Sequence, residues 1–497
     1  MGFEWNDFPQ EIRLLIFEAL IQDGCSLGPL ATVSREWQMK IEQHNFARIK
    51  LTPSRLPELD SMTRRNRALV DYIWICLELE DYDCTGCKSC MWSVDGELVK
   101  GHAREYRDHG NVTGIMHYLF YILGTWDPSG HLTLDISIHS PSDSKHWFKY
   151  LTFMPDTPAD KLVGRGGHSI EEMISNSTYH DPHHGWVAGV RHFAPPKHAF
   201  RRVFRTIMPW WAELPSVPAV TSLLLRQQTR RKWTEGSLAL MVACFPRLEE
   251  IHHEPWRHKG SPWKPKDADF RHLVDALRRS NKSLKKLVIF ENFNQRYPYP
   301  GGRNSVRSSH PASSWNLVMV SRRLEHLAAS FVVDASHFFD LKSPKKTWPR
   351  LTSLVLTSNL LTPGTSSVET GAMLQAAAAA AMRMPKLEMM EIWNGRKGLA
   401  ALFQYQAPRD IRPATITWRG TWELAMKPAV IQAWEAVVHL CGGWRLYLVR
   451  EQVDEAVIKS HADAIHHLKL AGQVMRPISL LQIRAEQKAL ERLPMVE

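Results

Sequence analysis

The back half of this 497-residue chain repeats one short pattern, and that pattern restricts the fold more than any other feature. A proline or small polar turn is followed by a leucine, two further residues and a second apolar residue. Successive copies start roughly 27 to 40 residues apart, a period typical of units that stack. The copies begin at Leu248, Leu284, Leu324, Leu351 and Leu387.

A helical pattern precedes most of these short strands. Residues 268–279 place Phe270, Leu273 and Leu277 on one face, and residues 370–382 contain a run of six alanines, a strong helix former. Prolines then end the helices and redirect the chain. Helix, turn and strand therefore form one unit, with the first strand expected at 219–225 and the last clear one at 414–418.

This unit resembles an irregular leucine-rich repeat, which implies a curved solenoid over residues 211–425. We accordingly expect the α/β class, with an irregular leucine-rich-repeat-like body. The alternative is an ordinary α/β domain in which the Leu-x-x-Leu strands are coincidental, because the units lack the asparagine signature of regular repeats.

Strand alternation assigns the two faces of the expected sheet. Leu287 and Ile289 should point to the core, and the residues between them to an open face. Solenoids bind partners on such faces, so we expect a protein target there. Alternatively, long loops cover the large aromatic residues. The expected target-binding residues are Lys286, Phe290, Val355, Glu391 and Trp393.

The N-terminus carries a second informative pattern. Ile12, Leu15, Ile16 and Leu20 recur at helical spacing after Pro9, and a second apolar set follows over residues 27–37. A unit of about forty residues rarely stabilises itself without a metal, disulfides or a partner. We therefore expect its apolar face to be buried against another protein.

Residues 8–41 resemble an F-box: Phe-Pro-x-Glu-Ile, Leu-Leu-Ile-Phe, then Leu-x-x-Leu-Ala-x-Val-Ser-Arg-x-Trp. Phe8 replaces the usual leucine, and the loop 21–26 lacks the usual Asp-rich turn. The resemblance implies a three-helix F-box within residues 1–50 that binds a Skp-family adaptor. The alternative is a helical hairpin packed on the body. The implied adaptor-binding residues are Phe8, Pro9, Ile12, Leu15, Ile16, Leu20, Leu30, Val33 and Trp37.

The resemblance also implies the function. The protein would be a non-enzymatic substrate receptor of a Skp–cullin–F-box ubiquitin ligase, with the adaptor, a cullin and an unknown protein target as partners. Segments 137–147 and 220–228 resemble a group of fungal F-box proteins of unknown substrate. Two alternatives are an F-box protein acting outside the ligase and a basic nucleic-acid-binding scaffold.

The remaining segments are less determined. Residues 51–210 form an α/β segment leading into the solenoid, with strands expected at 72–80 and 132–138 and a helix at 116–123. Residues 426–497 should cap the solenoid, with helices at 428–440 and 456–468 and a strand at 444–449.

Composition limits the compartment and the chemistry. With 44% hydrophobic and 23% charged residues, the chain is typical of folded proteins, and it contains no apolar run long enough for a membrane span. Seven irregularly spaced cysteines indicate a reducing compartment, so we expect cytoplasm, nucleus or both. No phosphate loop or nucleophile elbow is present, so no catalytic residue and no cofactor is expected.

Two clusters have alternative interpretations. Cys84, Cys87 and Cys90 have metal-like spacing, but no second ligand pair follows, so reduced thiols in a turn are favoured over zinc. Basic residues near tryptophans, namely Arg201, Arg202 and Arg205 and then Arg226, Arg230, Arg231 and Lys232, could bind a nucleic-acid backbone. We favour a solvated rim and expect no nucleic acid, because no recognised module accompanies the net charge of +11.

Overall fold

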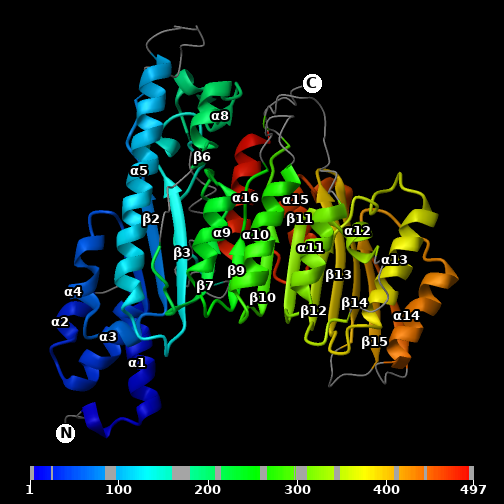
Figure 1. Ribbon diagram of the computed structural model, residues 1–497, viewed down its shortest axis with the longest axis horizontal. Coiled ribbons are helices and arrows are strands. Elements are labelled where there is room, and N and C mark those ends of the chain that lie inside the picture. The colour runs from blue at the N-terminus through cyan, green and yellow to red at the C-terminus, as the bar shows by residue number, and fades with distance from the viewer. Residues whose placement is uncertain are drawn as a thin grey trace.

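A twelve-stranded sheet runs through the computed structural model from one end to the other (Figure 1). The structure describes residues 5–23, 26–83, 97–158, 179–207, 214–257, 266–295, 297, 311–340, 347–407, 413–440 and 445–491. Cys84, Cys87 and Cys90 lie outside these residues. The strands lie in sequence order: β1 (Arg48–Leu51), β2 (Tyr72–Glu78), β3 (Leu132–His139), β7 (Val220–Leu225), β9 (Glu250–His253), β10 (Lys286–Phe290), β11 (His326–Asp334), β12 (Ser353–Thr357), β13 (Met389–Arg396), β14 (Leu399–Gln406), β15 (Ala414–Gly420) and β16 (Leu446–Gln452).

Neighbouring strands are parallel except around β14, which runs antiparallel to both β13 and β15. The fold is therefore mixed α/β with a large, mostly parallel sheet, which confirms the predicted class. Two short two-stranded sheets accompany it, namely β4 (Trp186–Val187) with β5 (Val190–Arg191) and β6 (Thr206–Ile207) with β8 (Lys232–Trp233).

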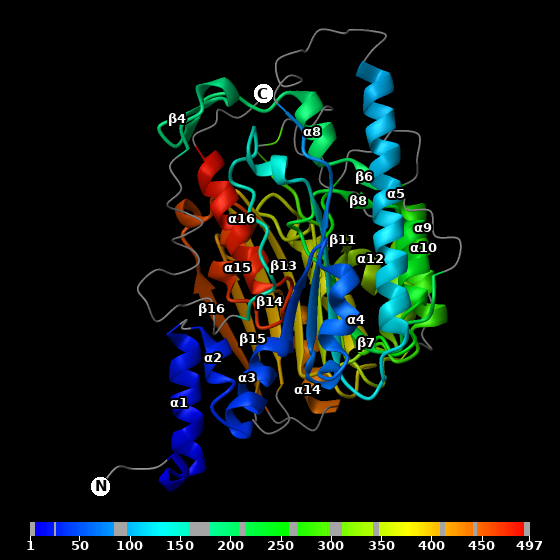
Figure 2. The same ribbon diagram turned by 90° about the vertical axis from the view of Figure 1, so that its left-hand side faces the viewer.

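Helices that connect consecutive strands cover one face of the sheet. Figure 2 shows α5, α9 and α10 on this helix face. Their apolar side chains form one continuous core with the strands. The helices of this layer are α4 (Leu59–Thr63), α5 (Glu97–Gly124), α9 (Glu235–Ala243), α10 (Lys266–Ser280), α11 (Pro311–Ser321), α12 (Ala335–Phe339), α13 (Ser367–Ala381) and α14 (Pro428–Leu440).

The remaining helices lie elsewhere. Three precede the sheet at its N-terminal end, namely α1 (Gln10–Gln22), α2 (Leu27–Leu30) and α3 (Arg35–Ala47). The short α8 (Lys197–Val203) follows β5. Two helices, α15 (His461–Leu468) and α16 (Pro477–Leu490), return across the other face of the sheet (Figure 2). None of the helices in the described residues is both long and apolar enough to traverse a bilayer.

The repeated leucine pattern has a direct structural reason. The second apolar residue of each copy pairs with its equivalent in the next strand, so that Ile251, Leu287, Leu327, Leu354 and Met390 form one row across β9–β13. All five are buried in the core on the helix face. A slip of one residue would turn a whole strand over, so this row fixes the register. The expected helices at 268–279 and 370–382 are α10 and α13.

Over β10–β14 the second face is closed, contrary to the expectation of an open binding face. Val288, Phe290 and Trp393 point to the predicted side, but they form a second apolar core with α15 and α16. The alternation was therefore predicted correctly and the exposure was wrong. The chain's own C-terminal segment covers this face. After β15, α14 and β16 continue the stack, whereas α15 and α16 fold back over the sheet.

The less determined segment 51–210 contributes β1, β2 and β3, which extend the sheet beyond β7. The strands expected at 72–80 and 132–138 are β2 and β3, and the helix expected at 116–123 lies within α5. The amino ends of the parallel strands from β1 to β13 share one edge of the sheet, here called the amino edge. Because α3 ends at Ala47 and β1 begins at Arg48, α1–α3 are attached at this edge (Figure 1).

Candidate protein-docking site

Residues 5–47, here called the N-terminal unit, fold as a short 3-10 helix (Trp5–Asp7) followed by α1–α3. Pro9 immediately precedes α1, where a missing N–H costs nothing. Ser34 caps α3 by accepting a hydrogen bond from the Trp37 backbone N–H at 3.4 Å. These local signals begin the helices where the sequence predicts them.

A small aromatic cluster holds the N-terminal unit together. The rings of Phe17 and Trp37 lie 4.7 Å apart, and Trp5 contacts both of them. Glu36 on α3 accepts hydrogen bonds from Arg13 at 2.8 Å and from the Trp5 indole at 2.9 Å. Trp37, which the sequence assigned to adaptor binding, therefore packs partly against other residues of the unit. The contributions of Trp5 and Phe17 to this cluster were missed, and Phe17 is buried by its contacts with Trp5 and Trp37.

Most other apolar side chains of the N-terminal unit are accessible. Ile12 is 40% exposed, Leu15 58% and Val33 62%. Pro9 is exposed, whereas Phe8, Ile16, Leu20 and Leu30 are half-buried. Among the described residues of α1–α3, Phe17 and Ile41 are the buried apolar ones. The expected adaptor-binding residues thus belong to a unit whose apolar surface is left partly open by the described residues, and Met39, 59% exposed, adds to it.

The expected target-binding residues are in a different situation. Phe290, Val355, Glu391 and Trp393 are buried beneath the C-terminal segment. Glu391 accepts hydrogen bonds from the backbone N–H groups of Ala471 and Gly472, at 2.8 and 3.0 Å. These four side chains cannot reach a partner while the segment stays in place, so the exposure on which their assignment to target binding depends is wrong.

Lys286, the fifth expected target-binding residue, is half-buried. It donates a hydrogen bond to the Gln473 side chain at 3.1 Å and forms an ion pair with Glu250 at 2.7 Å. The surface expected to bind a target is thus occupied by residues 471–473 of the same chain.

Gly472 explains how closely the segment approaches. A Cβ at this position would lie 2.4 Å from Val355 Cγ2, which real contacts do not show. Only glycine therefore fits between the segment and β12. This close approach, with the hydrogen bonds to Glu391, fixes the segment on the sheet.

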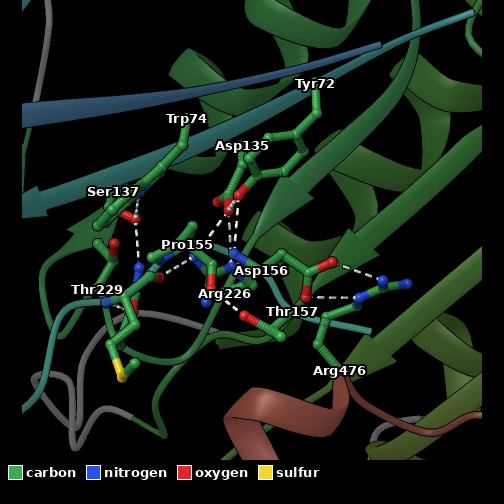
Figure 3. Close-up of polar contacts among 12 residues, drawn as sticks. Tyr72, Trp74, Asp135, Ser137, Pro155, Asp156, Thr157, Arg226, Thr229 and Arg476 are labelled. Carbon is green, nitrogen blue, oxygen red and sulfur yellow. Dashed lines mark hydrogen bonds and ion pairs between the residues drawn. The ribbon is translucent and has the colours of Figure 1, made fainter. Parts of the chain in front are cut away.

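A network of buried charges closes the same face near β2 and β3 (Figure 3). Asp135 and Arg226 form an ion pair at 2.7 Å whose side chains are fully buried, and the Tyr72 hydroxyl donates to Asp135 at 2.5 Å. Asp156 pairs with Arg476, which immediately precedes α16, at 2.6 Å. Burial raises the pKa of the Asp135 carboxyl, and Arg226 and Tyr72 partly oppose that shift.

Three of the residues considered for nucleic-acid binding, Arg226, Arg230 and Arg231, belong to such buried pairs. Arg226 pairs with Asp135, Arg230 with Glu486 at 2.5 Å, and Arg231 with Asp143 at 2.5 Å. They are neither a nucleic-acid surface nor the solvated rim that we favoured. The three arginines lie in the loop that follows β7. Acidic residues on β3, on the turn after β3 and on α16 neutralise their charges. A sequence pattern shows the positive charge but not these distant partners.

Comparisons with known proteins add one finding. A search of curated proteins finds no match. Residues 279–476 match a family of unknown function (DUF6546). The matched segment runs from the end of α10 through α15 to Arg476, and so contains both the strands β10–β16 and the residues 471–473 that cover them.

Proposed function

We propose that this protein is a substrate receptor of a Skp–cullin–F-box type ubiquitin ligase. The N-terminal unit binds a Skp-family adaptor, and the adaptor links it to a cullin. The observation that carries the proposal is the accessible apolar surface of α1–α3, at the positions where the resemblance to an F-box requires one. Ile12, Leu15 and Val33 would become buried only in a complex.

The expected energetics are consistent with docking. Full burial of a Leu, Ile or Val side chain contributes about 1.5–3 kcal/mol, and these residues are roughly half exposed. Several of them together contribute several kcal/mol before the cost of association. The aromatic cluster of Trp5, Phe17 and Trp37 keeps the unit folded meanwhile, so the docking surface is formed before the adaptor arrives.

The sheet body, meaning residues 48–491, would hold the target. We propose that its helix–turn–strand units are an irregular leucine-rich repeat, because they wind in one direction and place their helices on one face. The body supplies no catalytic residue in this proposal. It raises the effective concentration of target lysines near the ubiquitin-charged enzyme. A reducing compartment, cytoplasm or nucleus, suits this role.

The proposal is tested by affinity purification of the tagged full-length chain, read by mass spectrometry. The wild type should retain a Skp-family adaptor and a cullin, and Leu15→Asp should lose both. Val368→Asp is the matched control, because Val368 on α13 is a similarly exposed apolar residue (63%) of the sheet body. Equal recovery of the adaptor with all three chains would refute the proposal.

One alternative is separated by the same experiment. An F-box protein that acts outside the ligase would retain the adaptor without the cullin. The resemblance within α1–α3 concerns the adaptor alone, so this outcome would keep the docking site and change the consequence of docking.

A further inference from the structure

A basic cavity lies at the amino edge of the sheet, where the ends of α10 and α11 meet the turn that leads into β12. It has a volume of about 300 Å³ and is lined by Arg278, Met319, Arg322, Arg323, Thr347 and Pro349. The described residues that line it include three guanidinium groups and no acidic side chain. An open cavity with this lining favours a negatively charged occupant.

Two of the three arginines are oriented by backbone carbonyls. Arg323 Nη2 donates to the Arg278 carbonyl at 2.6 Å, and Arg322 Nε donates to the Thr347 carbonyl at 3.3 Å. These bonds orient the guanidinium groups without neutralising their charge. Asp275 approaches Arg278 Nε at 3.6 Å, but both side chains are well exposed, so water screens this pair.

Cations near helix C-termini also interact favourably with the helix dipole, and that role alone needs no ligand. The helix dipole does not explain why arginines from two different helix–turn–strand units surround one cavity. Arg278 belongs to α10, whereas Arg322 and Arg323 follow α11. A guanidinium has five N–H donors, and the bonds described use one donor each of Arg322 and Arg323. Donors therefore remain for a carboxylate or phosphate, which arginine binds in a two-pronged geometry.

We propose that this cavity binds an acidic side chain, a carboxylate or a phosphate ester, in a segment of a protein partner. The lining favours a peptide over nucleic acid, because the described lining residues include no aromatic ring on which a base could stack. Met319 and Pro349 offer apolar contact to the neighbouring part of a side chain instead.

The position of the cavity bears on which partner would supply the acidic segment. The cavity and the N-terminal unit both lie at the amino edge, since α3 joins β1 there and β10–β12 start there. If the protein is a ligase receptor, as proposed above, the acidic segment belongs to the target. This consequence rests on the proposed function, whereas binding by the cavity does not.

The test uses the purified full-length chain and fluorescence anisotropy. The probes are labelled 12-residue Gly/Ser peptides that carry at their centre four glutamates, one phosphoserine or four glutamines. A 12-nucleotide thymidine strand is the fourth probe. Arg278→Ala combined with Arg322→Ala removes two cavity charges and leaves Arg323 bonded to α10. The matched control, Arg450→Ala with Lys459→Ala, removes the same charge at exposed positions of the C-terminal region.

We expect the glutamate or the phosphoserine peptide to bind the wild type and the glutamine peptide not to bind. Removal of charge-assisted hydrogen bonds should weaken acidic-peptide binding at least about ten-fold in the cavity variant, and less than two-fold in the control. Equal weakening in both variants, tighter binding of the thymidine strand, or no binding of either acidic peptide would overturn the proposal. The cavity variant should still retain the adaptor, so a failure here is distinguishable from failure of the proposed function.

Discussion

The N-terminal unit exposes apolar side chains, whereas the sheet body buries charged ones. Leu15 is 58% exposed, while the Asp135–Arg226 pair is fully enclosed. Exposed apolar surface contributes nothing to folding of the free chain but becomes favourable on association. Buried ion pairs contribute little net stability and are costly to break singly. The difference agrees with the proposed docking of a partner on α1–α3, whereas the chain itself covers the second sheet face over β10–β14.

The way each region satisfies its polar groups supports this reading. In the N-terminal unit, Arg13 and Glu36 are partly solvated and link two helices. In the sheet body, Arg226 and Arg230 come from one loop and pair with acids on β3 and α16. The loop after β7 therefore fixes how the covering segments lie on the sheet. Because buried ion pairs add little net stability, this positioning is the better explanation for the presence of the buried charges.

The largest effect that would test the comparison is loss of one partner in the buried network. Asp135→Ala leaves the Arg226 guanidinium buried without its carboxylate, and we expect a loss of about 3–5 kcal/mol in the free energy of unfolding. Urea denaturation of the full chain measures it. Asp60→Ala is the control, because Asp60 pairs with Arg64 and Arg67 at the surface, where little change is expected. Similar losses in both variants would mean that burial of the charges is unimportant.

A pH dependence should distinguish the sheet body next. Burial lowers the pKa of His139 to about 4, of His252 to about 4 and of His461 to about 3, below the ordinary value of 6.5. Between pH 6.5 and 4 the unfolded chain binds protons that the folded chain does not, so stability falls as the pH falls. Each such histidine contributes a slope of about 1.4 kcal/mol per pH unit.

His461→Gln isolates one of these contributions. His461 Nε2 lies 2.9 Å from Asn292 Oδ1, and the glutamine amide keeps a donor there. The slope of the unfolding free energy between pH 6 and 4.5 should decrease by about one proton's share relative to the wild type. An unchanged slope in urea titrations at several pH values would show that His461 is not buried as a neutral group.

A smaller effect is expected where the C-terminal segment meets the sheet. Gly472→Ala places a methyl group against Val355, and overpacking of this kind costs about 1–3 kcal/mol. The strain should act locally. The backbone N–H groups of Ala471 and Gly472 donate hydrogen bonds to Glu391, so their hydrogen exchange should accelerate. Gly364→Ala is the control, because the added Cβ there meets no atom within 4 Å. Unchanged exchange in Gly472→Ala would contradict the close approach.

Local patterns in the sequence predict the sheet well and its cover poorly. The leucine pattern places the buried row from Ile251 to Met390, and alternation separates Leu287 from Val288 correctly. What the pattern cannot reveal is contact between distant segments. Glu391 was expected in solvent because its partners, Ala471 and Gly472, lie eighty residues away and offer backbone groups that any sequence has. In the N-terminal unit, helical spacing identifies the apolar face, on which Ile12 and Leu15 are exposed while Ile16 and Leu20 are half-buried.

The smallest expected change in stability is the sharpest test of the N-terminal unit. Leu15→Ala removes a side chain that is 58% exposed, so the unfolding free energy of the full chain should change by less than about 0.5 kcal/mol. Phe17→Ala, two residues along the same helix, removes one of the three rings of the aromatic cluster. It should destabilise α1–α3 by about 3 kcal/mol. Limited proteolysis after α1 would report this local loss. If Leu15→Ala instead proved as destabilising as Phe17→Ala, Leu15 would be part of the chain's own core and could not belong to an adaptor-binding surface.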